Sequence, residues 1–200
     1  MQRAFLVFVL ATFALLAGVI VFLFRVPVEP VEPVVQVEAA APEIVKYPSF
    51  TMNDIDGNPR EFSEWDGRHR LLNFWATWCA PCRREIPLLK EFQAEQGDDG
   101  ILIMGIAVDF PEEVAAFAEA AEFNYPILVG QEEAMIVAES SGVQFIAMPF
   151  TMIVSRDGEY LGAYLGELHR SHLDKISKVL ARLDEAEINS EQAKEALALL

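Results

Sequence analysis

The sequence predicts an α/β domain with a mixed central sheet and helices on both faces, preceded by one transmembrane helix. Two observations support the domain: short apolar runs alternate with helical patterns, and the last two runs are spaced to form a hairpin. The transmembrane helix is predicted by a long uncharged stretch near the N-terminus.

The transmembrane helix is expected within residues 1–25, which form the predicted membrane anchor. The stretch from Ala4 to Phe24 carries no charge, and at about 1.5 Å per residue it spans about 30 Å, the thickness of a bilayer core. The alternative is a cleaved secretory signal. However, the stretch exceeds the usual length of about 7–15 apolar residues, and Arg25-Val26-Pro27 stands where a small-residue cleavage site would lie. The sequence therefore favours an uncleaved anchor.

Residues 26–46 are predicted to form a linker rich in proline and glutamate. Pro27, Pro30 and Pro33 recur at every third position, which favours extended polyproline II structure and excludes a helix. At about 3.1 Å per residue, the segment from Pro27 to Pro42 reaches on the order of 50 Å. We therefore expect it to act as a spacer.

Residues 47–185 have the size of one domain. An N-terminal hairpin is expected from Ser49–Met52 and Arg60–Ser63, which flank a turn-forming segment. The further expected strands are Leu71–Trp75, Ile101–Val108, Thr151–Val154 and an edge strand, Tyr160–Tyr164, after the turn Asp157-Gly158. The expected helices are Cys82–Gln96, Pro111–Glu122, Glu132–Ser140 and His169–Leu183, and residues 186–200 are expected to form a helical tail on the surface, with a helix over Ser190–Leu200.

The charge balance argues against one class of partner. The chain has a formal net charge of −16 at pH 7, whereas binding to phosphate groups requires clustered Lys and Arg. The one basic cluster of note, Arg68-His69-Arg70, is short and is interpreted as a solvated turn. We therefore expect no binding of nucleic acid.

The strongest chemical signal is the motif Cys79-Ala80-Pro81-Cys82, between a predicted strand and a predicted helix. These are the only two cysteines, and their spacing brings both sulfurs within bonding reach at a helix N-terminus, where the pKa of a thiol is lowered. The motif predicts thiol–disulfide exchange. Cys79 would be the partly exposed nucleophile, and Cys82 the deeper thiol that resolves the mixed disulfide.

Other uses of a cysteine pair fit less well. A structural zinc site needs further ligands, and the three histidines show no ligand spacing. Haem attachment needs a histidine directly after the second cysteine, where Arg83 stands. An inert structural disulfide would normally close a longer loop. We expect no metal ion and no cofactor other than the redox-active disulfide Cys79–Cys82.

The stretch Phe74–Pro87, with the sequence FWATWCAPCRREIP, resembles the active-site segment of the thioredoxin superfamily, in its TlpA/ResA-like branch of membrane-anchored thiol–disulfide oxidoreductases. The resemblance covers most of Tyr47–Leu183 and includes Ile103–Asp109, Met148–Thr151 and Ser155–Gly158. It implies a thioredoxin-like fold for residues 47–185.

The resemblance also implies a substrate-binding surface around the cysteine pair. Pro149 matches the family's cis-proline, beside which the backbone of Met148 would pair with a substrate segment. Trp78 matches an aromatic position beside the pair, and together with Ala80 and Pro81 it is expected to contact the substrate.

A proton acceptor is implied as well. Glu85 matches an acidic residue that can exchange protons with the buried thiol; the alternative is a solvated glutamate on the helix surface. Asn73 stands where thioredoxin itself has a buried aspartate, so Glu85 becomes the better candidate.

These features together predict a dithiol reductant that is anchored in a bacterial inner membrane with its domain in the periplasm, where disulfides persist. The resemblance implies substrates of the cytochrome c or metal-site assembly type, and recharging by a membrane electron donor of the CcdA/DsbD kind. A Cu(I) metallochaperone that uses Cys79 and Cys82 is an alternative. A thiol peroxidase is a weaker one, because its motif requires Pro and Thr where Leu72 and Ala76 stand.

The predicted topology can be tested by fusing alkaline phosphatase, which needs disulfides to fold, to the C-terminus. Active fusion enzyme is expected in the membrane fraction of a bacterial host, because the uncharged stretch stays attached. Inactive fusions would contradict the orientation. Activity confined to the soluble periplasmic fraction, with a mature N-terminus beyond Phe24, would show that the stretch is a cleaved signal.

Overall fold

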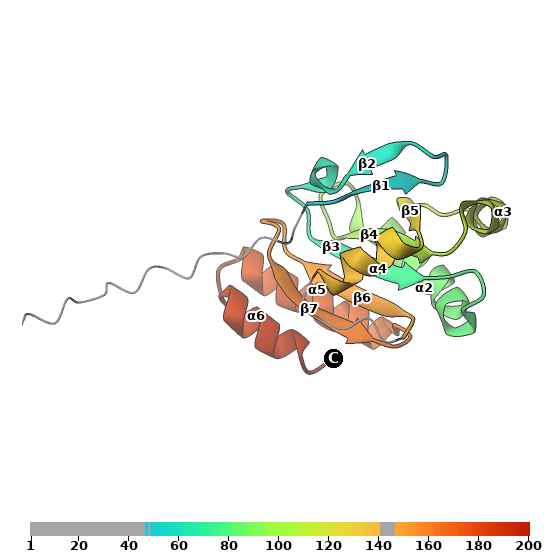
Figure 1. Cartoon of the computed structure of the whole chain (residues 1–200). Helices are drawn as coiled ribbons and strands as arrows, with labels where there is room; N and C mark the ends of the chain where they lie inside the picture. The colour runs from blue at the N-terminus through green and yellow to red at the C-terminus, as the bar shows by residue number, and fades with distance from the viewer. Residues whose placement is uncertain (1–46, 48, 141–146) are drawn as a thin grey trace, which may run out of the picture. The chain divides into compact units, whose positions relative to one another are not determined.

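The computed structural model describes residue 47 and residues 49–140 and 147–200, which fall within one compact unit (Figure 1). The predicted anchor and the whole of the predicted linker lie outside the described residues. Among the residues that are described, no helix is both long enough and apolar enough to cross a membrane.

The described residues form a seven-stranded mixed sheet with the order β2-β1-β5-β4-β3-β6-β7. The strands are β1 (Thr51–Asp54), β2 (Pro59–Glu61), β3 (Arg70–Trp75), β4 (Leu102–Val108), β5 (Ile127–Gly130), β6 (Phe150–Val154) and β7 (Tyr160–Leu165). The three central strands, β3, β4 and β5, are parallel, and the outer strands join them in antiparallel pairs. The predicted mixed sheet is confirmed.

Helices cover both faces of this sheet (Figure 1). They are the 3₁₀ helix η1 (Phe62–Trp65) and the α-helices α2 (Ala80–Gln96), α3 (Pro111–Ala121), α4 (Glu132–Glu139), α5 (Arg170–Asp184) and α6 (Ser190–Leu197). The buried side chains of α2, α3, α5 and α6 pack in the core on one face, and those of α4 and η1 pack in the core on the other.

The alternation of side chains along β3 explains why two cores form. Leu71 and Trp75 point to the core shared with α2 and α5, whereas Leu72 and Phe74 point to the core shared with α4. All six residues of β3 are buried, which is the expected condition of a central strand with both faces covered. Its largely apolar sequence, interrupted by Arg70 and Asn73, is therefore a consequence of its position.

The sequence analysis missed one strand, β5. This strand has only four residues, and it pairs in parallel with β4 and antiparallel with β1. A run so short, placed between two helical patterns, has no periodicity that separates a strand from a loop. The predicted hairpin, the other strands and the edge position of β7 are found, with shifts of a few residues at their ends.

The interpretation of Arg68-His69-Arg70 as a solvated turn is wrong, because His69 and Arg70 are buried. The guanidinium of Arg70 lies 4.3 Å from the centre of the Phe62 ring and donates a hydrogen bond of 2.7 Å to Asp66. The His69 ring bonds to Asp184 at 2.9 Å. Both side chains thus find partners within the fold. This polar segment can therefore form the buried beginning of a strand.

The described chain begins beside the N-terminal end of β3, at the opposite end of this strand from the cysteine motif. The backbone N–H of Tyr47 donates to the carbonyl of Gly158, in the turn between β6 and β7. The antiparallel register pairs Val154, just before this turn, with Arg70, the first residue of β3. The chain thus enters the domain at the edge where β3 begins.

The C-terminal helix α6 is part of the domain core on its inner face. Ala193 and Leu197 are fully or almost fully buried in the core beneath α5 and β7. On the rim, Lys194 forms an ion pair of 2.8 Å with Glu159. The predicted surface helix therefore also closes one side of the core.

The contribution of α6 can be measured with two leucines that differ in burial. Leu197 is 2% exposed and Leu199 is 77% exposed. Leu197→Ala should lower the free energy of unfolding by about 2–4 kcal/mol, because it leaves a cavity in the core, whereas Leu199→Ala should change it by less than about 0.5 kcal/mol. Urea unfolding measures both; equal small effects would show that α6 does not support the core.

Candidate active site

The candidate site lies at the edge of the sheet where the parallel strands β3 and β4 end. The chain leaves β3 at Trp75 and reaches the cysteine motif within four residues. Strand β6 runs antiparallel to β3, with Phe150 opposite Phe74, so the segment before β6 lies at the same edge. The register therefore brings the cysteine motif and the Met148-Pro149 segment together.

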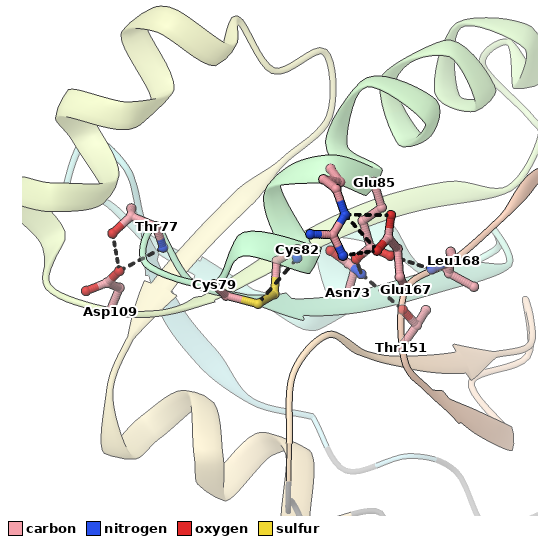
Figure 2. The surroundings of a disulfide bond; sticks show 10 residues. Asn73, Thr77, Cys79, Cys82, Glu85, Asp109, Thr151, Glu167 and Leu168 are labelled. Carbon is pink, nitrogen blue, oxygen red and sulfur yellow. Dashed lines mark hydrogen bonds and ion pairs between the residues drawn. A yellow bond between two sulfur atoms is a disulfide. The ribbon is translucent and has the colours of Figure 1, made fainter.

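Cys79 and Cys82 form a disulfide at the N-terminus of α2 (Figure 2). Cys79 is the N-cap of the helix, and its Sγ accepts a hydrogen bond of 3.3 Å from the backbone N–H of Cys82. The first turn of α2 carries no acidic residue, and the exposed Arg83 and Arg84 follow the pair. The position at the helix N-terminus stabilises negative charge on the Cys79 sulfur once the bond is reduced.

The two sulfurs differ in depth, but less than the sequence analysis expects. Cys82 is fully buried, and Cys79 is 5% exposed. The expectation of a partly exposed Cys79 is therefore wrong for the oxidised form, because the disulfide holds its sulfur against Cys82 in the core. Cys79 remains the more accessible of the two.

The Met148–Pro149 peptide bond is cis. Pro149 is buried, while Met148 is half-buried and packs against the core cluster that contains both cysteines. The cis-proline that the resemblance implies is thus found at the edge that carries the disulfide. Pairing of the Met148 backbone with a substrate remains a prediction.

Glu85 is buried within a hydrogen-bond network of neutral groups (Figure 2). Its Oε1 accepts a hydrogen bond of 2.8 Å from Asn73 Nδ2, and its Oε2 accepts one of 2.6 Å from the backbone N–H of Leu168. Asn73 Nδ2 also donates to Thr151 Oγ1 at 3.0 Å. The alternative of a solvated glutamate is therefore wrong, since the side chain points into the domain.

The surroundings of Glu85 bring its ionisation close to neutral pH. Burial raises the pKa of Glu85 to about 7, and the hydrogen bonds from Leu168 and Asn73 oppose this rise only in part. Glu85 follows Cys82 by three positions in α2, a spacing that places two side chains on the same side of a helix. A carboxyl group that can gain or lose a proton near pH 7 thus lies on the helix face of the buried cysteine.

The remaining predicted site residues lie on the surface beside the disulfide. Trp78 is 68% exposed, Ala80 is exposed and Pro81 is half-buried. Trp75, by contrast, is buried and packs against the rings of Phe117 and Phe123, with 5.4 Å between ring centres. Of the two tryptophans in the motif, only Trp78 is accessible to a partner.

The sequence analysis missed two polar residues that hold the loop before Cys79. Oδ2 of the buried Asp109 accepts hydrogen bonds from the backbone N–H of Thr77, at 2.9 Å, and from its hydroxyl group, at 2.6 Å. Each residue lies one or two positions after the end of a predicted strand. This position after a strand was the signal that could have identified them, but only the register of β3 and β4 shows that the two residues are opposite each other.

The described residues contain no group of three or more His, Cys, Asp or Glu side chains that could hold a metal ion. The two cysteine sulfurs, which a soft metal ion at this site would need as ligands, are bonded to each other here. The arrangement supports redox exchange at the disulfide.

The sequence profile of the AhpC/TSA family matches residues 45–159, which is more than half of the chain. The chain is 28% identical over 129 residues to the thiol-disulfide oxidoreductase ResA of Geobacillus kaustophilus, a match that covers 64% of this chain and 72% of that protein. It is 27% identical over 134 residues to the thioredoxin-like protein YneN of Bacillus subtilis, with coverage of 64% and 74%.

A solved structure with the same fold comes from Chlorobium tepidum TLS. It is a thiol:disulfide interchange protein of the thioredoxin family, 26% identical in sequence, and it superposes with a TM-score of 0.63 over 70% of this chain and 99% of that one. The predicted thioredoxin-like fold is confirmed.

The raised pKa of Glu85 gives a pH-dependent prediction for the oxidised protein. The folded state holds this proton more tightly than the unfolded chain, so ionisation of Glu85 costs stability as the pH rises through the window between about 4.5 and 7. Glu85→Gln cannot ionise. The free energy of unfolding of the variant, relative to the wild type, should therefore rise by about 2–3 kcal/mol between pH 5 and pH 8. Urea unfolding at each pH measures this difference, and a constant difference would contradict the raised pKa.

Proposed function

This chain belongs to the AhpC/TSA family and is a thiol–disulfide oxidoreductase with a thioredoxin-like fold, and from that premise we propose that it reduces disulfide bonds in proteins outside the cytoplasm. The observation that carries the proposal is the disulfide Cys79–Cys82 at the N-terminus of α2. A disulfide placed there leaves, after reduction, a stabilised thiolate at Cys79, the more accessible of the two sulfurs, and a fully buried thiol at Cys82 behind it.

The reaction follows from the positions of the two sulfurs. In the reduced protein, the Cys79 thiolate attacks one sulfur of the substrate disulfide, and the other substrate sulfur leaves as a thiolate that takes up a proton. The thiol of Cys82 then loses its proton and attacks Cys79 Sγ, which releases the second substrate sulfur. Two electrons pass to the substrate, and the disulfide Cys79–Cys82 is formed again.

Glu85 is the proposed acceptor of the Cys82 proton. Three observations support this role: its burial, its position three residues after Cys82 and a pKa near 7. A base with a pKa close to the ambient pH is well suited to both taking up and releasing a proton. Asn73 and Leu168 orient the carboxyl group through their hydrogen bonds.

The cellular setting is proposed from the sequence. The uncharged stretch within residues 1–25 and the proline-rich linker support an inner-membrane protein with its domain in the periplasm. Substrates of the cytochrome c or metal-site assembly type, and a membrane electron donor of the CcdA/DsbD kind, are proposed from the resemblance to the TlpA/ResA-like branch.

Trapping of mixed disulfides tests the function. Cys82→Ser should accumulate disulfide-linked adducts with substrate proteins on non-reducing gels, because Cys79 can attack but the adduct cannot be resolved. Cys79→Ser is the matched control and should form far fewer. Adducts of equal amount from both variants, or from neither, would contradict the assigned roles.

The direction of electron flow is tested by the reduction potential of the pair. We expect roughly −200 to −270 mV, in the range of glutaredoxins and thioredoxin, because Ala80-Pro81 adds no charge or histidine between the cysteines. Equilibration with glutathione measures the value. A potential near −120 mV would indicate an oxidant rather than a reductant.

A further inference from the structure

Two loops are joined beside the disulfide by a single buried carboxylate. Asp109 Oδ2 accepts both hydrogen bonds from Thr77, and Asp109 Oδ1 accepts one of 2.9 Å from the backbone N–H of Phe110. In Figure 2 this contact lies on one side of the disulfide and the Glu85 network on the other. Asp109 is 5% exposed, so these bonds are made largely out of contact with solvent.

The parallel register of β3 and β4 explains this contact. Trp75 is opposite Ala107 at the ends of the two strands, and two further residues bring Thr77 next to Asp109. The residues that follow each of them, Trp78 and Phe110, are therefore carried by loops that are fixed to each other.

Trp78 and Phe110 share an unusual exposure. They are 68% and 52% exposed, and the other large hydrophobic side chains that are prominently exposed in the described part of the chain are aliphatic. Exposed aromatic rings on two joined loops are suited to binding a partner, because aromatic side chains provide a large contact area. Both rings belong to the loops that flank the reactive cysteine.

We propose that Trp78 and Phe110 form one aromatic surface that binds an extended segment of the substrate protein next to its disulfide, and that Asp109 is the positioning residue of this surface. The inference rests on the proposed function. Glu112 and Glu113, both exposed, directly follow Phe110 and Pro111 at the start of α3. The segment that fits this surface therefore has an apolar residue for the rings and a Lys or Arg for the carboxylates.

The test uses synthetic peptides that each contain one intramolecular disulfide. The first carries Leu and Lys beside the disulfide, the second Leu and Glu, and the third Ser and Lys. Bis(2-hydroxyethyl) disulfide serves as a reference that needs no binding surface. The rate of reaction with the reduced protein is measured for each compound, and the wild type should react fastest with the Leu and Lys peptide.

Phe110→Ser should slow the reaction with the Leu and Lys peptide by about three- to tenfold, as expected for the loss of one aromatic contact, and leave the reaction with the small disulfide unchanged. Leu199→Ser is the matched control, since Leu199 is more exposed than Phe110 but lies beyond the end of α6. It should change neither rate.

The positioning role is tested by a pair of substitutions at Thr77. Thr77→Val removes the hydroxyl group that donates to Asp109, whereas Thr77→Ser keeps it. The ratio of the peptide rate to the small-disulfide rate should be lower in Thr77→Val than in the wild type. In Thr77→Ser it should be close to the wild-type ratio. A ratio unchanged in Thr77→Val would overturn the role of Asp109.

Other results would overturn the binding surface itself. An equal slowing of both reactions in Phe110→Ser would show a structural effect, and no slowing of either reaction would show that the ring is not used.

The specificity has its own contrary outcome: equal wild-type rates with all three peptides would remove it. A dimer that Phe110→Ser abolishes would assign the rings to a second copy. A wild type that reacts with the small disulfide but with no peptide contradicts this inference, whereas one that reacts with no disulfide contradicts the proposed function.

Discussion

The parallel pairing of β3 with β4 is the constraint on which the site depends. Because both strands end at the same edge of the sheet, the loops that follow them meet there, and one of these loops leads directly into the disulfide at the start of α2. The antiparallel pairing of β6 with β3 brings the cis bond before Pro149 to this same edge. Three segments that are distant in the sequence are thus placed around two sulfur atoms by backbone register alone.

Two acidic groups of the site are hydrogen-bonded to neutral partners. Glu85 has hydrogen bonds from an amide side chain and a backbone N–H, and no cation compensates its charge among these contacts. Burial therefore governs its ionisation, which is brought close to neutral pH. Asp109 is bonded to two backbone N–H groups and a hydroxyl group, and it serves to fix loops. Two buried carboxyl groups beside one disulfide thus suit different tasks, because their surroundings differ.

Local signals predicted most of this fold and the centre of the site. The cysteine motif, the long central strands and the helices have periodicity or spacing that a sequence displays directly. The strand β5, the burial of His69 and Arg70, and the contact of Thr77 with Asp109 depend on partners far away in the chain. No local pattern contains that information. Glu85 is an intermediate case, because the sequence indicated its importance but could not decide between a buried and a solvated position.

The place where the chain enters the domain has a practical consequence. Tyr47 bonds to the turn between β6 and β7, at the edge where β3 begins, whereas the disulfide lies beyond the edge where β3 ends. The six residues of β3 separate the two places by about 20 Å. A biosensor surface or affinity resin coupled upstream of Tyr47 would therefore hold the domain by its inert end. The redox-active end would face the flowing sample, so immobilisation in this orientation leaves it open to dissolved proteins.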